Sequence, residues 1–128
     1  MKHEKQLRAH VREAILAIIA TIDNNPFEKR SLYDLTIETG LNRNVLQLGF
    51  KQLLGTTFKQ YVIQKRLERA RALLEEGRLT RKQIAYKCGY KSLSAFSTAF
   101  KKVHGLAPKE IGEYAWSCVA ATLYRYHV

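Results

Sequence analysis

Two segments of the sequence place short polar and basic side chains at intervals that suit the binding of a polyanion. The first segment contains Asn44, Gln47 and Lys51, and the second contains Ser94 and Thr98. Side chains three or four residues apart lie on one face of a helix. An amide can pair with two edges of adenine in the DNA major groove, and a lysine neutralises phosphate. An ordinary solvated helix face is the alternative explanation of the same pattern.

The charge of the chain favours a polyanionic partner. The 128 residues carry 22 Lys and Arg against 11 Asp and Glu, giving a net charge of +11 and a pI near 9.9. Such a charge on a small domain is typical of nucleic-acid binding, although a merely soluble basic protein would share it. The length predicts a single domain.

No constellation in the sequence predicts catalysis or a metal site. The four histidines lack ligand spacing, and Cys88 and Cys118 form neither a CxxC motif nor a disulfide framework. No GxSxG, HExxH or phosphate-binding glycine loop occurs. We therefore expect no enzyme activity, no metal and no cofactor. The absence of a signal peptide or long apolar run predicts a cytoplasmic, nucleoid-associated protein.

The two segments lie in a repeated pattern that predicts how they are positioned. The stretches Leu35–Gly55 and Ile84–Gly105 each predict a short helix, a glycine turn and a longer helix, which is a helix-turn-helix arrangement. Three positions recur at an offset of 50 residues: Phe50 as Phe100, Lys51 as Lys101, and Gly55 as Gly105.

Local signals set the boundaries of these helices. Gly40 and Gly89 are expected to form the two turns. Four residues are expected to cap helix N-termini: Ser31, Asn42, Thr80 and Ser92. The helical period predicts a core containing Leu32, Leu35, Ile37, Leu46, Phe50, Leu53, Ile84, Ala85, Cys88, Phe96, Phe100 and Val103.

A long helix is predicted between the two copies, from Thr57 to Glu76. Thr57 and Gln60 have the capping-box spacing, and Gly77 ends the helix. An apolar stripe follows the helical period: Ile63, Leu67, Ala70 and Leu74. At about 30 Å, the helix nearly matches the distance of roughly 34 Å between successive major-groove faces of DNA. A further helix is expected from Glu4 to Asn24.

The stretch RLERARALL (66–74), followed by QIAYKCGYKSLSAFSTAFKKVHGLAPKEI (83–111), resembles the DNA-binding domain of the AraC/XylS family of transcription regulators. The resemblance covers about residues 11 to 111. It implies an all-α fold of about seven helices, with two helix-turn-helix subdomains joined by a long central helix. It also implies a monomer that places both recognition helices in adjacent major grooves of double-stranded DNA.

Within this single DNA-binding domain, we expect subdomain one at 4–55, a linker helix at 57–76, subdomain two at 80–111 and a C-terminal extension at 113–128. The resemblance, together with the outward-facing positions of the repeat, predicts the DNA-contacting residues. They are Arg43, Asn44, Gln47, Leu48 and Lys51 in the first subdomain, and Lys91, Leu93, Ser94, Ala95, Ser97, Thr98 and Lys101 in the second.

Three functions are compatible with these observations. The leading hypothesis is a sequence-specific transcriptional activator that also contacts RNA polymerase. A non-specific architectural nucleic-acid binder is the second, supported by the high charge and by the scarcity of long polar side chains such as Arg on the second recognition helix. The third is a helical protein-interaction module, supported by the aromatic extension, which could also dimerise the chain. Many members of the family carry a ligand-sensing domain, for which 128 residues leave no room, so we expect either a short effector-free activator or an excised DNA-binding module.

Overall fold

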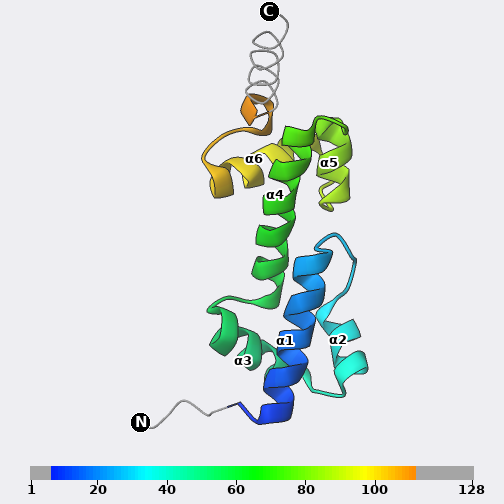
Figure 1. Ribbon diagram of the computed structural model, residues 1–128, viewed down its shortest axis with the longest axis vertical. Coiled ribbons are helices and arrows are strands. Elements are labelled where there is room, and N and C mark those ends of the chain that lie inside the picture. The colour runs from blue at the N-terminus through cyan, green and yellow to red at the C-terminus, as the bar shows by residue number, and fades with distance from the viewer. Residues whose placement is uncertain (1–6, 112–128) are drawn as a thin grey trace, which may run out of the picture. The chain divides into compact units, whose positions relative to one another are not determined.

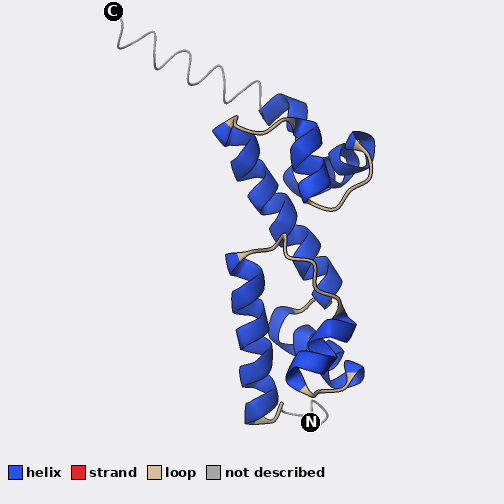
Figure 2. Cartoon of the chain, turned by 90° about the vertical axis from the view of Figure 1, so that its right-hand side faces the viewer, coloured by secondary structure: helices blue, strands red, loops and turns tan. Residues whose placement is uncertain are grey.

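The structure is a computed structural model that describes residues 7–111. Within this range every regular element is helical, as predicted, and Figures 1 and 2 show no strand there. The helices are α1 (Ala9–Asn24), α2 (Leu32–Thr39), α3 (Arg43–Leu54), α4 (Phe58–Glu76), α5 (Arg81–Lys87) and α6 (Leu93–His104), followed by a helical turn at 108–111. The predicted helix start at Glu4, Cys118 and the extension 113–128 lie outside the described residues.

The chain divides into two compact units, and the division falls inside α4. Unit 1 ends at Lys65 and unit 2 begins at Arg66. The first part of α4 therefore belongs to one unit and the second part to the other. The expected division differs in that it treats the whole of 57–76 as a separate linker.

The core of unit 1 forms between α1, α2 and α3. The apolar stripe of α1 is buried, with Ile15 fully inaccessible, and it packs against Leu46 and Phe50 of α3. The start of α4 covers this core through Phe58, whose ring centroid lies 5.3 Å from that of Phe50. The prediction that Ile37 faces the core is wrong, because its side chain is 66% exposed. Two residues beyond buried Leu35, Ile37 falls on the opposite face of α2.

The core of unit 2 contains the second part of α4 together with α5 and α6. Its buried apolar residues are Leu67, Ala70, Leu74, Ile84, Ala85, Cys88, Phe96, Phe100 and Ile111. The prediction that Val103 is buried is wrong, because 44% of it is exposed. In this last turn of α6, His104 takes the inward position and donates towards the Leu67 carbonyl.

The helix starts follow the predicted caps. The side-chain oxygens of Ser31, Asn42, Thr80 and Ser92 each accept a bond from the backbone N–H three residues on, at 2.9–3.1 Å. Thr57 does the same for Gln60 at 3.1 Å. The prediction that the Gln60 side chain reaches back to Thr57 is wrong, because its Oε1 atom accepts from the Thr56 hydroxyl at 2.8 Å instead.

Candidate nucleic-acid interface

The position of α3 depends on a close approach to α1. Gly49 of α3 is buried, and a Cβ atom there would lie 1.9 Å from Cδ1 of Ile15. Only hydrogen fits at this contact, so glycine leaves room for the Ile15 side chain of α1 to pack directly on α3. With this side of α3 turned inward, Asn44, Gln47 and Lys51 are exposed on the other side.

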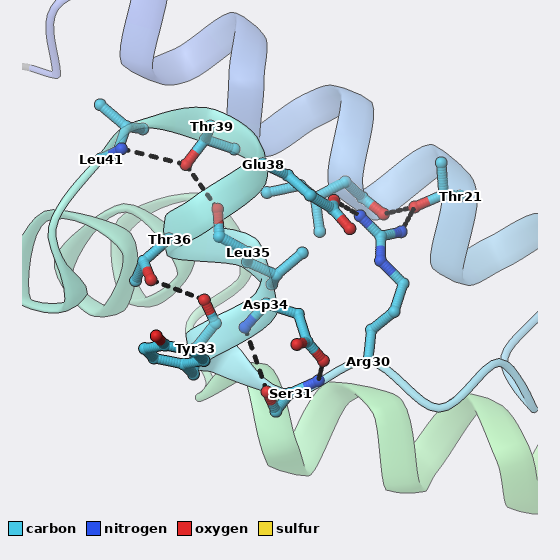
Figure 3. A network of polar contacts seen from close by, with 11 residues as sticks. Thr21, Arg30, Ser31, Tyr33, Asp34, Leu35, Thr36, Glu38, Thr39 and Leu41 are labelled. Atoms are coloured by element: carbon cyan, nitrogen blue, oxygen red, sulfur yellow. Dashed lines mark hydrogen bonds and ion pairs between the residues drawn. The ribbon is translucent and has the colours of Figure 1, made fainter.

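The segment before α3 is held by a network of polar contacts (Figure 3). Arg30 donates to the Thr21 hydroxyl of α1 at 2.9 Å and pairs with Glu38 of α2. Ser31 and Asp34 form a capping box, and the bond from the Ser31 backbone N–H holds the pKa of the Asp34 carboxyl below its usual value. These contacts fix the start of α2 against α1.

The turn between α2 and α3 is fixed in turn by Thr39. Its hydroxyl donates to the Leu35 carbonyl at 2.7 Å and accepts from the Leu41 N–H at 3.2 Å (Figure 3). Gly40 adopts a φ of 71°, which an L side chain rarely tolerates. The direction of α3 is therefore set by defined contacts on both sides of the turn.

Aromatic packing positions α6 within unit 2. The rings of Phe96 and Phe100 are buried with their centroids 5.6 Å apart, and Tyr90 lies 5.8 Å from Phe96. Most of the predicted contact residues are on the exposed side: Lys91, Leu93, Ser94, Ala95, Thr98 and Lys101. Ser97 is half-buried and lies at the edge of that face.

The exposed faces of α3 and α6 correspond position by position. At the 50-residue offset, five exposed positions of α3 have counterparts in α6: Arg43 corresponds to Leu93, Asn44 to Ser94, Gln47 to Ser97, Leu48 to Thr98 and Lys51 to Lys101. Neither helix contains an acidic residue, and none occurs between Glu76 and Glu110. The N-terminal end of a helix carries a partial positive charge, so both faces are electrostatically suited to an anion.

The amides of Asn44 and Gln47 are available for external hydrogen bonds. Asn42 caps α3, and neither amide bonds another residue of the described part of the chain. A bidentate amide can pair with the N6 and N7 positions of adenine.

Unit 2 has a surface depression that was not predicted from the sequence. An open depression of about 390 Å³ lies between α5 and the start of α6, and its lining includes Lys82, Tyr86, Tyr90, Lys91 and Leu93. Tyr86 is 78% exposed. The helical period of α5, with Ile84 and Ala85 buried, places Tyr86 on the outside, so that signal could have identified it.

Potential metal ligands do not gather in residues 7–111. No set of three potential metal ligands occurs in that range. The Cys88 thiol is buried, and burial raises its pKa to about 11, so it is protonated at neutral pH. No helix in the part of the chain that the structure describes is long and apolar enough to cross a membrane.

The family of the chain follows from comparison with known proteins. A family described as helix-turn-helix domain matches residues 35–113, which include both glycine turns and both exposed faces. The chain belongs to the AraC/XylS family of transcription regulators. The resemblance stated from the sequence is thereby confirmed, and so is the all-α fold class.

Relatives within the AraC/XylS family include a probable transcriptional regulator, LumQ, of Photobacterium leiognathi. It is 34% identical over 87 residues, which are 68% of this chain and 35% of LumQ. The F1 operon positive regulatory protein of Yersinia pestis is 36% identical over 95 residues, covering 73% of this chain and 32% of that protein. The chain therefore spans only about a third of the length of these relatives.

A solved structure shares the fold. The AraC-type DNA-binding domain protein from Chromobacterium violaceum superposes with a TM-score of 0.73 at 29% identity, covering 84% of this chain and 96% of that one.

Proposed function

We propose that this protein regulates transcription by binding duplex DNA at specific sequences, with α3 and α6 as its recognition helices. The main support for this proposal is that two helices present an exposed face without acidic residues at equivalent positions. Each of these helices follows a glycine turn and begins with an N-terminal cap. In this proposal, side chains near the start of each helix contact bases, while Lys51 and Lys101 contact phosphates.

We also propose that one chain occupies two successive major grooves and that binding activates transcription. The two faces belong to one polypeptide with a continuous 19-residue helix between them, which supports the binding of both faces by a single chain. An activating role is supported by the positive regulator among its relatives. In this proposal, activation includes a contact to RNA polymerase. Such a protein would act at the nucleoid.

A non-specific architectural role is the second candidate, and the net charge of +11 favours it. The two functions differ in specificity ratio, since specific proteins bind their sites typically about 10³-fold or more above bulk DNA. Selection of bound sequences from random duplexes, followed by competition with bulk DNA, measures this ratio. A recurrent sequence with a large ratio supports regulation; equal binding to all duplexes overturns it.

Variants of α3 sharpen this experiment. Asn44→Ala and Gln47→Ala should each weaken binding to the selected site by about 1–3 kcal/mol, with the loss confined to one or two base pairs. Asn24→Ala, at the exposed end of α1, is the matched control and should bind as the unaltered protein does. If the α3 variants lose as much affinity for random DNA as for the selected site, the base contacts are wrongly assigned.

A further inference from the structure

The faces of α3 and α6 differ in chemistry although their positions correspond. At three equivalent positions, the longer polar side chains Arg43, Asn44 and Gln47 of α3 are replaced in α6. Their counterparts are Leu93, Ser94 and Ser97. The first half of the repeat can therefore donate several hydrogen bonds to base edges, and the second half cannot do so to the same extent.

Two hydroxyl groups on or next to α6, those of Thr98 and Ser92, are engaged within the protein. Thr98 donates its hydroxyl proton to the Ser94 carbonyl at 3.1 Å, one turn earlier in the helix. Ser92 uses its hydroxyl to cap the helix, and Ser97 is half-buried. The exposed part of Thr98 thus offers a methyl group and hydroxyl lone pairs, but no proton.

Apolar groups make up much of the remaining surface of this face. Ala95 and Thr98, three residues apart, are neighbours on the exposed side of α6, and Leu93, which is 38% exposed, lies at the edge of that side in the first turn. Lys91 precedes these residues and Lys101 follows them, so that cations flank an apolar strip. The only apolar group that a base pair presents in the major groove is the C5 methyl of thymine.

Resting on the proposed function, we infer that unit 2 recognises thymine methyl groups through Leu93, Ala95 and Thr98. Lys91 and Lys101 hold the strip against the groove by contacting phosphates. On the same DNA, α3 then makes amide hydrogen bonds that α6 cannot make, and α6 relies on methyl contacts. Guanine is disfavoured under Leu93, because its N7 and O6 acceptors would lose water without gaining a donor.

Replacement of thymine by deoxyuridine tests this inference, since it removes the C5 methyl and leaves every hydrogen-bonding group in place. Each thymine of the selected site is replaced in turn, and the dissociation constant is measured with the full chain. At the contacted thymines, affinity should fall about fourfold per methyl lost, from the usual value of burying one such group.

Protein variants assign the contact to α6. Thr98→Ser keeps the hydroxyl bond to Ser94 and removes only the methyl, and Leu93→Ser removes the apolar group at the helix start. Each variant should weaken binding to the thymine site, yet bind the uracil site as tightly as the unaltered protein does. Thr36→Ser, the same change on α2, is the control and should leave the uracil effect intact.

The outcomes separate this inference from the proposed function. If a site is selected and uracil has no effect, or if its effect persists undiminished in Thr98→Ser and Leu93→Ser, methyl recognition by α6 is wrong while regulation stands. If no site is selected, the proposed function fails and the inference fails with it. A uracil loss that disappears in these two variants supports both.

Discussion

The Nε2 atom of His104, the last residue of α6, lies 2.9 Å from the backbone carbonyl oxygen of Leu67 in α4. A carbonyl can only accept, so Nε2 carries the proton. The imidazole also packs on Phe100, with centroids 4.4 Å apart. This pair joins the C-terminal end of α6 to the part of α4 that belongs to unit 2.

Removing the imidazole should destabilise unit 2. His104→Ala loses a hydrogen bond and an aromatic contact, and we expect the free energy of unfolding to fall by about 1–3 kcal/mol. Urea denaturation measures the change. Lys102→Ala, an exposed neighbour on α6, should remain within about 0.5 kcal/mol of the unaltered protein. Equal stabilities of the two variants would show that the bond contributes little.

Gly49→Ala should destabilise unit 1 even though alanine favours helices. The gain in helix propensity is about 1 kcal/mol, whereas overpacking a filled core costs about 1–3 kcal/mol. The clash is with Cδ1 of Ile15, which is fully buried. Ile15→Val deletes that atom, so the double variant should lose less stability than the two single changes added together. Additive losses in thermal or urea unfolding would contradict the contact.

Neutralising Lys51 or Lys101 should weaken binding to all duplexes alike. A phosphate contact releases a counterion, and its loss should reduce the slope of log K against log salt by about one unit. Binding titrations of Lys51→Gln and Lys101→Gln across a salt series provide the measurement. Lys29→Gln, the same charge change in the loop before α2, is the control. An unchanged slope would remove that lysine from the phosphate contacts.

The Cys88 thiol should react slowly with alkylating reagents. Its pKa is raised from 9.0 to about 11, chiefly by burial, so the folded state favours the neutral thiol. The raised pKa makes folding more favourable while the thiol is neutral. This contribution to the free energy of unfolding is fully present below about pH 9 and is lost as the pH rises towards about 11. In a Cys118→Ser background, the iodoacetamide rate should rise about tenfold from pH 9 to pH 10. A rate that levels off near pH 9 would contradict the burial effect.

Inserting two alanines between Lys65 and Arg66 tests whether α4 acts as a spacer. The insertion turns one part of the helix by about 200° relative to the other and lengthens it by about 3 Å. Each unit keeps its own core residues, so thermal unfolding should change little, while binding to the selected site should collapse and salt-sensitive binding to random DNA should survive. Retained specific binding, or a footprint of two chains on a symmetric site, would refute the spacer.

The sequence predicted the features of the fold that depend on local chemistry. Ser31 and Thr80 cap helices as predicted, and the spacing of Thr80 to Gln83 indicated its cap because both partners lie within one turn. Burial at helix ends was less predictable. Val103 has the right spacing to Phe96, but His104 occupies the inward position, and its partner, Leu67, lies 37 residues away.

The candidate site shows the same contrast between features that a repeat or a local pattern predicts and contacts that depend on another helix. Repeat symmetry predicted the exposed faces of α3 and α6, since equivalent positions in two copies must face the same way. The close approach at Gly49 could not be predicted, because it depends on the side chain of Ile15 in another helix. The DNA contacts of the individual residues remain predictions.

The division of α4 between the two units has a consequence for cooperativity. About four backbone hydrogen bonds of an α-helix span any one peptide link, including that between Lys65 and Arg66. A helix of about ten residues is marginal in water, so each part of α4 depends on the core against which it packs. When one unit unfolds, its part of α4 loses that support, and the bonds across the link are lost from the end of the other part. We therefore expect that unfolding of one unit frays the end of the α4 part that belongs to the other.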